Sequence, residues 1–118
     1  MNNADLLTDR LFQRELCSIT LLKEYMQFNF DGPIFNFYEL PRLGLDERWV
    51  NPAEPGYFDH VQKFLGAKVA SVEEIPDVLL NLGFDSGCSV QLSLKPEDRS
   101  SVEVAMFQAG GGNGWAVW

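Results

Sequence analysis

The chain has 118 residues, of which 46% are hydrophobic and 13% aromatic. This length fits one ordinary domain, and so much apolar surface can offset the conformational entropy that keeps other chains disordered. Nine Lys and Arg against 17 Asp and Glu give a net charge of −8. Because affinity for phosphates comes mainly from basic groups, this charge argues against direct nucleic-acid binding. We therefore expect a single domain over residues 1–118 that does not bind nucleic acid.

The N-terminal segment and the cysteines indicate the compartment. Residues 1–5 lack the basic segment and apolar run of a secretory signal, and no stretch approaches the roughly 20 apolar residues that cross a bilayer. The sequence predicts a cytoplasmic protein without membrane contact. Cys17 and Cys88 are then expected to be buried, reduced thiols rather than a disulfide.

The first predicted element is a long N-terminal helix. An apolar stripe at spacings of three and four residues follows residues 12 to 26, formed by Phe12, Leu16, Ile19, Leu22 and Met26. This spacing is typical of an amphipathic helix. The Gly32-Pro33 pair ends the helix at or before residue 31.

The next segment predicts a strand followed by a loop. Residues 34–39 are apolar on both faces and read as a short strand. Residues 40–56 contain three of the six prolines and predict a long surface loop. Such loops are uncommon in small domains and are often functional, so this one is a candidate binding surface. An equally supported alternative is that residues 40–56 form a covering segment, which packs its apolar residues onto the core: Leu43, Leu45, Trp49 and Val50.

Two further helices are predicted. Residues 57–65 have apolar residues on one helical face and Gly66 as a stop. A second helix is expected to begin at Pro76 and to place Ile75, Val78, Leu79 and Leu82 on its inner face. Gly83 is then expected to adopt a positive φ and to end that helix.

The C-terminal third predicts a meander. Residues 88–94 and 102–107 each alternate apolar and polar side chains, which indicates a half-buried antiparallel hairpin. The glycine-rich residues 110–114 reverse the chain, and residues 115–118 return as a third strand with Trp115 and Trp118 on opposite faces. The expected fold class is α+β: a long N-terminal helix and one or two shorter helices packed on a three- or four-stranded antiparallel sheet with a C-terminal meander.

No catalytic, cofactor or metal site is assigned. The glycine cluster lacks the Lys and Ser or Thr of a phosphate-binding loop and leaves no room for a following helix. His60 is the only histidine, and we expect it on the surface of a short helix. A small enzyme with a pocket near His60 remains an alternative function.

Charge distribution provides the functional hypothesis. Residues 31–60 carry six acidic residues against Arg42 and Arg48, with aromatic residues among them. Acidic groups around aromatic anchors suit capture of a basic protein, because charge guides the approach and buried aromatics supply most of the affinity. The expected partner-binding residues are Glu39, Asp46, Glu47, Trp49, Glu54, Tyr57 and Asp59. A solvated acidic loop whose aromatic residues point inward fits the same pattern.

The size, the charge and the acidic-aromatic segment of residues 39–58 resemble the small acidic immunity proteins of bacterial toxin systems. The resemblance implies a cytoplasmic protein that neutralises a basic partner, often a nuclease toxin, by stoichiometric binding. The sequence matches no diagnostic motif of that family, so we transfer no functional residue from it. A self-associating structural subunit, such as a homodimer, is a further alternative.

Overall fold

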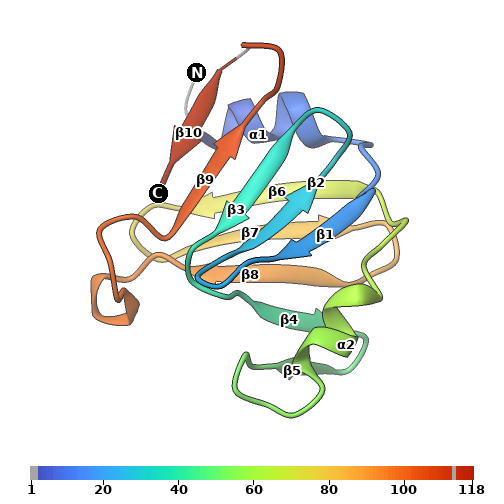
Figure 1. Cartoon of the computed structure of the whole chain (residues 1–118), viewed down its shortest axis with the longest axis vertical. Coiled ribbons are helices and arrows are strands. Elements are labelled where there is room, and N and C mark those ends of the chain that lie inside the picture. The colour runs from blue at the N-terminus through green and yellow to red at the C-terminus, as the bar shows by residue number, and fades with distance from the viewer. Residues whose placement is uncertain (1–2, 113) are drawn as a thin grey trace.

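The computed structural model describes residues 3–112 and 114–118, and most of its regular structure is antiparallel sheet (Figure 1). The first sheet has the order β1 (Ser18–Leu21), β2 (Met26–Asn29), β3 (Ile34–Phe37), β9 (Ala105–Gln108), β10 (Trp115–Val117). The second has the order β5 (Arg48–Val50), β4 (Arg42–Leu45), β8 (Ser89–Ser93), β7 (Leu79–Phe84), β6 (Val69–Ile75). The helical elements are α1 (Asn3–Leu11), α2 (Tyr57–Gln62) and the 3₁₀ helix η1 (Pro96–Asp98).

The core lies between the two sheets. The first sheet contributes mainly phenylalanines, and the second contributes aliphatic side chains from alternate positions of β7 and β8: Phe28, Phe35, Phe37, Phe107, Leu80, Leu82, Val90 and Leu92. Helix α1 packs against β6 and β10 at one end of the sheets, and α2 lies at the opposite end (Figure 1). Within residues 3–112 and 114–118, no helix is long and apolar enough to cross a membrane.

The predicted α+β fold with a long N-terminal helix is wrong, because the chain forms two five-stranded sheets. Helix α1 ends at Leu11, and Gln13 has a φ of 69° that interrupts helical geometry. The residues assigned to the rest of that helix form β1 and β2. Side chains of Met26 and Phe28 face the core because β2 pairs with β3, Phe28 lying opposite Phe35. A period of two therefore prevails over the three-and-four spacing of the stripe.

The predicted helix after Pro76 is also wrong. Residues 76–78 form a turn in which Asp77 has a φ of 62°, and β7 follows, paired on both sides with β6 and β8. Gly83 lies inside β7 without a positive φ, so it is no helix stop. A Cβ atom at this position would lie 2.4 Å from the Ser71 Oγ atom on the neighbouring strand, which is why a glycine fits there.

Most of the first alternating run and the end of the second form strands, β8 and β9, but these two strands do not pair with each other as predicted. Strand β8 pairs with β7 and β4 in the second sheet, whereas β9 pairs with β3 and β10 in the first. Residues 94–104, with η1, carry the chain from one sheet to the other. Alternation reports which face of a strand is buried, and it holds no information about the strand's partner.

Residues 40–56 are not an irregular loop. They contain the β4–β5 hairpin, and β4 is an interior strand between β5 and β8. Leu43 and Val50 lie opposite each other and are both buried, so part of the segment packs onto the core. Cys17 is exposed rather than buried, Cys88 is half-buried, and both are free thiols.

Several local predictions are confirmed. Strand β3 and helix α2 form where expected, and Gly66 follows α2 with a φ of 87°. Strand β10 pairs with β9, although Asn113 in the preceding reversal lies outside the described residues. The two terminal tryptophans face opposite ways, since Trp118 is 8% exposed and Trp115 is 68% exposed.

Candidate functional site

The structure does not bring all seven predicted partner-binding residues together. Glu39 lies at the far end of the second sheet, where its carboxylate accepts hydrogen bonds from the Ser100 backbone N–H at 2.8 Å and from the Ser100 hydroxyl. Tyr57 is buried. The remaining residues are exposed or half-buried on the β4–β5 hairpin, on the segment after it and on α2: Asp46, Glu47, Trp49, Glu54 and Asp59.

Tyr57 is buried, so its side chain does not lie on the surface with the other predicted partner-binding residues. Its hydroxyl donates a 2.5 Å hydrogen bond to the Pro41 carbonyl, and its ring meets Phe58 edge-on with centroids 5.1 Å apart. Burial raises the pKa of the Tyr57 phenol well above its ordinary value. Tyr57 thereby fixes the start of α2 against the residues that lead into β4.

Tyr57→Phe should lower the free energy of unfolding by about 1–3 kcal/mol, because the buried Pro41 carbonyl loses its hydrogen-bond donor. Urea titration followed by far-ultraviolet circular dichroism measures this change. Tyr38→Phe is the matched control, since the Tyr38 hydroxyl forms no hydrogen bond with any described residue. Equal stability of the Tyr57 variant and the control would contradict a structural role for the Tyr57 hydroxyl.

The exposed end of the β4–β5 hairpin is formed by Asp46, Glu47 and Trp49, which we call the hairpin surface. Asp46 and Glu47 form the two-residue turn, and Trp49 projects from the outer face of the second sheet, opposite Gly44. The Trp49 ring lies against Gly44, where a Cβ atom would come within 3.0 Å of it. Trp49 is nevertheless 43% exposed. Glycine at position 44 therefore makes room for an aromatic side chain that lies close to the neighbouring strand and remains accessible.

Arg42 also contacts the Trp49 ring. The Arg42 Cζ atom lies 4.0 Å from the ring centroid, a cation–π distance. The guanidinium is oriented by Gln91, whose Oε1 atom accepts hydrogen bonds of 2.8 Å from Nε and 2.5 Å from Nη2. Contacts within the chain thus restrain the Trp49 side chain, although part of it is exposed.

The carboxylates of Asp46 and Glu47 are exposed and make no ion pair or hydrogen bond with the described residues. They border a shallow depression of about 330 Å³ that also includes Trp49, Gly87 and Ser89. Gly87 belongs to the β7–β8 turn, so two turns distant in the sequence meet at this edge of the sheet. The lining of the depression therefore includes two unpaired carboxylates, the cationic Arg48 and the aromatic ring of Trp49.

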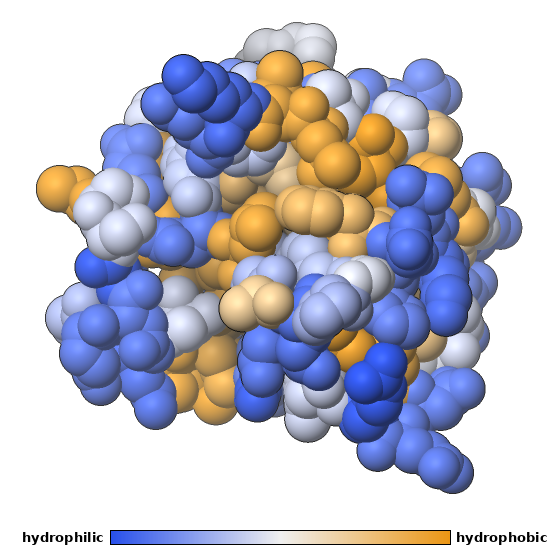
Figure 2. Space-filling model, turned by 60° about the horizontal axis from the view of Figure 1, so that its bottom comes forward, coloured by the Kyte–Doolittle hydropathy of each residue, from blue (hydrophilic) through white to orange (hydrophobic). Residues whose placement is uncertain are grey.

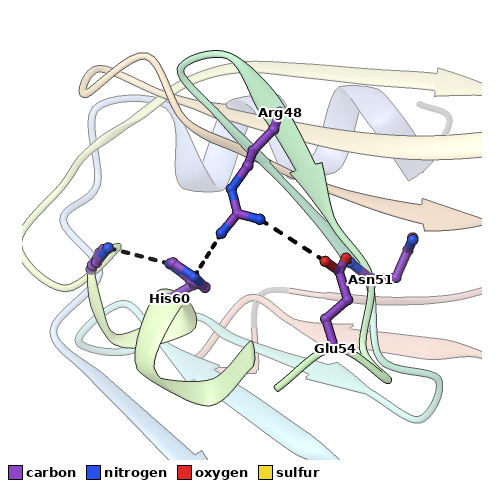
Figure 3. Close-up of polar contacts among 5 residues, drawn as sticks. Arg48, Asn51, Glu54 and His60 are labelled. Atoms are coloured by element: carbon purple, nitrogen blue, oxygen red, sulfur yellow. Dashed lines mark hydrogen bonds and ion pairs between the residues drawn. The ribbon is translucent and has the colours of Figure 1, made fainter. Parts of the chain in front are cut away.

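A polar network lies beside the hairpin surface (Figure 3). The Arg48 guanidinium approaches Glu54 at 4.0 Å, and Glu54 Oε2 accepts a 2.5 Å hydrogen bond from the Asn51 backbone N–H. Arg48 Nη2 also lies 3.1 Å from Nε2 of His60, and Lys63 Nζ lies 3.3 Å from Nδ1. Glu54 therefore already has a cationic neighbour, whereas Asp59 has none within the described residues.

The surroundings of His60 do not favour catalysis. A neutral imidazole accepts a hydrogen bond at one nitrogen only, yet both ring nitrogens face cationic donors. In the described part of the chain, no hydroxyl, thiol or carboxylate hydrogen-bonds to His60, so no nucleophile or orienting acid is present there. Nor do three His, Cys, Asp or Glu side chains among these residues gather as a metal site would require.

Sequence reasoning missed Arg42 and Gln91, which share a larger groove of about 600 Å³ with Leu79, Ser93, Lys95 and Asp98. In that groove the Ser93 hydroxyl donates a 2.6 Å hydrogen bond to Asp98. The polar positions of β8 were predicted to share one face, which could have indicated Gln91, but the loop assignment of residues 40–56 concealed its partner Arg42.

Comparison of the chain with protein-family models, with curated proteins and with solved structures returned no match.

Proposed function

We propose that the protein is a binding module that inhibits a basic protein partner, such as a nuclease toxin, by stoichiometric binding through the hairpin surface. The observation that carries the proposal is the exposed Trp49 ring, which contacts Arg42 and Gly44 and lies beside the free carboxylates of Asp46 and Glu47. Restrained aromatic residues in the centre of an interface supply most of the binding energy. Free carboxylates around such a residue attract a basic partner and set its orientation.

The charge of the whole chain supports the same function. A net charge of −8 attracts a basic protein over a distance of about 8–10 Å at ordinary salt concentrations. Both cysteines are free thiols, which supports a cytoplasmic location, where proteins are kept reduced. Of the residues assigned from the sequence, Asp46, Glu47 and Trp49 form the proposed contact, whereas Asp59 lies on α2.

The test begins with isolation of the partner from the native cells with tagged full-length protein as bait. The partner and the protein are then purified, and their association rate is measured over a series of salt concentrations. We expect a 1:1 complex with a basic protein whose activity is inhibited and whose association slows as salt rises. A partner without excess positive charge, or an association rate that does not depend on salt, would refute the proposal.

Asp46→Lys combined with Glu47→Lys should lower the association rate about tenfold at low salt, with an unchanged melting temperature, because both side chains are exposed and unpaired. Trp49→Ala should act mainly on the dissociation rate, because it removes contact area rather than charge. Stopped-flow mixing with the purified partner measures both rates.

The matched control is Glu97→Lys combined with Glu103→Lys. Both double variants change the net charge from −8 to −4, so they weaken long-range attraction equally. Glu97 lies beyond the end of β8, whereas Asp46 lies beside its beginning, so the two pairs occupy opposite ends of the second sheet. Equal slowing by both variants would mean that only total charge matters and that the hairpin surface is not the contact.

A further inference from the structure

A groove of about 600 Å³ lies on the outer face of the second sheet and shares no lining residue with the depression at the hairpin surface. In its floor, Arg42 of β4 lies opposite Gln91 of β8. Beside them, Leu79 of β7 lies opposite Ser93 of β8. The segments before β4, after β5 and after β8 form the walls. Sites for small molecules are concave and have volumes of about 300–1,000 Å³, so the groove has the size of such a site.

The Arg42 guanidinium presents a free donor edge at this groove. Its Nε and Nη2 atoms both donate to Gln91 Oε1, at 2.8 Å and 2.5 Å. The two N–H groups of Nη1 and the second N–H group of Nη2 remain, and they form no hydrogen bond or ion pair with the described residues. An edge of this kind matches two oxygens of a carboxylate or phosphate. Gln91 therefore orients Arg42 in a way that leaves it able to bind an anionic group.

Lys95 adds a second cation to the groove. Its Nζ atom forms no hydrogen bond or ion pair with the part of the chain that the structure describes. The carboxylates of Glu39 and Asp98 line the same groove, but neither forms an ion pair with a described residue. Both already accept hydrogen bonds, Glu39 from Ser100 and Asp98 from the Ser93 hydroxyl. The cations of the groove are therefore unpaired, whereas its carboxylates have partners within the chain.

Apolar side chains line the groove together with these cations. Leu40 and Leu79 are half-buried, and Val78 is 36% exposed. Exposed apolar residues also lie between hydrophilic ones elsewhere on the surface, as Figure 2 shows from the side of α2 and β5, so exposure alone indicates no site. The groove differs because its apolar side chains share one concavity with two unpaired cations. Ligand sites combine an apolar lining with a few polar groups that fix the orientation of the ligand.

We propose that this groove binds a small organic anion, in which one carboxylate or phosphate group is attached to an apolar body. The anionic group accepts hydrogen bonds from the free edge of Arg42 and is attracted by Lys95. The apolar body packs on Leu79 and Val78. A nucleic acid does not fit, because its many phosphates are repelled by a chain with a net charge of −8. The hairpin surface does not line the groove, so this proposal is independent of the proposed function.

Titration of the full-length protein with small probes, followed by NMR of its backbone amides, tests the proposal. Hexanoate and hexyl phosphate carry both an anionic group and an apolar body, whereas hexanol lacks the charge and inorganic phosphate lacks the apolar body. We expect hexanoate, hexyl phosphate or both to bind about tenfold more tightly than hexanol and inorganic phosphate. The shifts should be centred on β4, β8 and residues 95–98, and the tighter of the two organic anions identifies the anionic group that the groove prefers.

Two variants each remove one cation of the groove. Arg42→Gln should weaken binding of the organic anions at least about tenfold, because it removes charge-assisted hydrogen bonds. Lys95→Gln should weaken it about threefold, as expected for an exposed ion pair. Because Arg42 also contacts the Trp49 ring, Lys95→Gln is the variant that leaves the hairpin surface unchanged. The amide spectrum of each variant verifies that it is folded.

Lys68→Gln is the matched control, since Lys68 is exposed, precedes β6 and lies outside the groove. It changes the net charge by the same amount as the other two variants and should bind the organic anions like the wild type. The proposal is refuted if neither organic anion shifts the groove amides at about 20 mM, or if hexanol or inorganic phosphate binds as tightly as both organic anions. Wild-type affinity in folded Arg42→Gln and Lys95→Gln also refutes it, as does an equal loss in Lys68→Gln.

Discussion

Removal of Trp118 by truncation after Val117 should lower the free energy of unfolding by about 3–5 kcal/mol, the cost of deleting a large buried aromatic side chain. Trp118 is 8% exposed, and its ring lies 5.6 Å from that of Phe35 between centroids. Its backbone N–H donates to the Ala105 carbonyl at 3.0 Å, and its carbonyl accepts from the Val104 N–H at 2.7 Å. Trp118 therefore closes the core beside the beginning of β9. Urea unfolding followed by circular dichroism measures the loss.

Trp115→Ala is the control for this truncation. Trp115 is 68% exposed, and substitution of such a surface residue usually changes stability by about 0.5 kcal/mol or less. An equal loss of unfolding free energy in the two variants would mean that the different burial of the two tryptophans does not affect stability. A truncated protein as stable as the full chain would show that the C-terminal residue is frayed in solution.

Phe35→Ala should have an effect of similar size, about 3–5 kcal/mol, because the substitution leaves a cavity at the centre of the first sheet. Phe35 is fully buried in β3, between Phe28 on β2 and Phe107 on β9 in the strand register. Its ring centroid lies 4.6 Å from that of Phe37 and 6.4 Å from that of Phe107. Urea titration measures the change, and an unchanged m-value would show that only stability is altered.

Phe12→Ala is the matched control for Phe35→Ala, since the Phe12 side chain is about half exposed. We expect it to cost less than about 1 kcal/mol. Combining Phe35→Ala with removal of Trp118 should cost less than the sum of the two, because the two rings contact each other and that contact is lost only once. A fully additive result would contradict the ring contact.

The candidate site was only partly accessible from the sequence. Acidic residues around an aromatic residue identified Asp46, Glu47 and Trp49, because charge and side-chain type are local properties. The same reasoning also included Tyr57, since it could not show that the phenol reaches the Pro41 carbonyl and lies in the core. It missed Arg42, because stacking on Trp49 follows from the pairing of β4 with β5.

The sequence by itself determined the elements whose signals are local. The apolar run of residues 34–37, the short helix before Gly66 and the terminal strand with oppositely facing tryptophans all formed as expected. Alternation also identified the buried positions of β8 correctly. Each of these signals lies within a few residues of the chain, and no distant segment competes with it.

The tertiary structure alone decided which segments pair and, through pairing, which are strands. A helix satisfies its backbone hydrogen bonds internally, but a strand depends on neighbours that the sequence does not name. Residues 26–29 and 79–84 fit a helical pattern locally, yet β2 is hydrogen-bonded to β1 and β3, and β7 to β6 and β8. Strands β8 and β9 follow each other in the chain but lie in different sheets, because β9 buries Phe107 beside Phe35. Burial of such side chains from distant segments outweighs the weak local preference for helix.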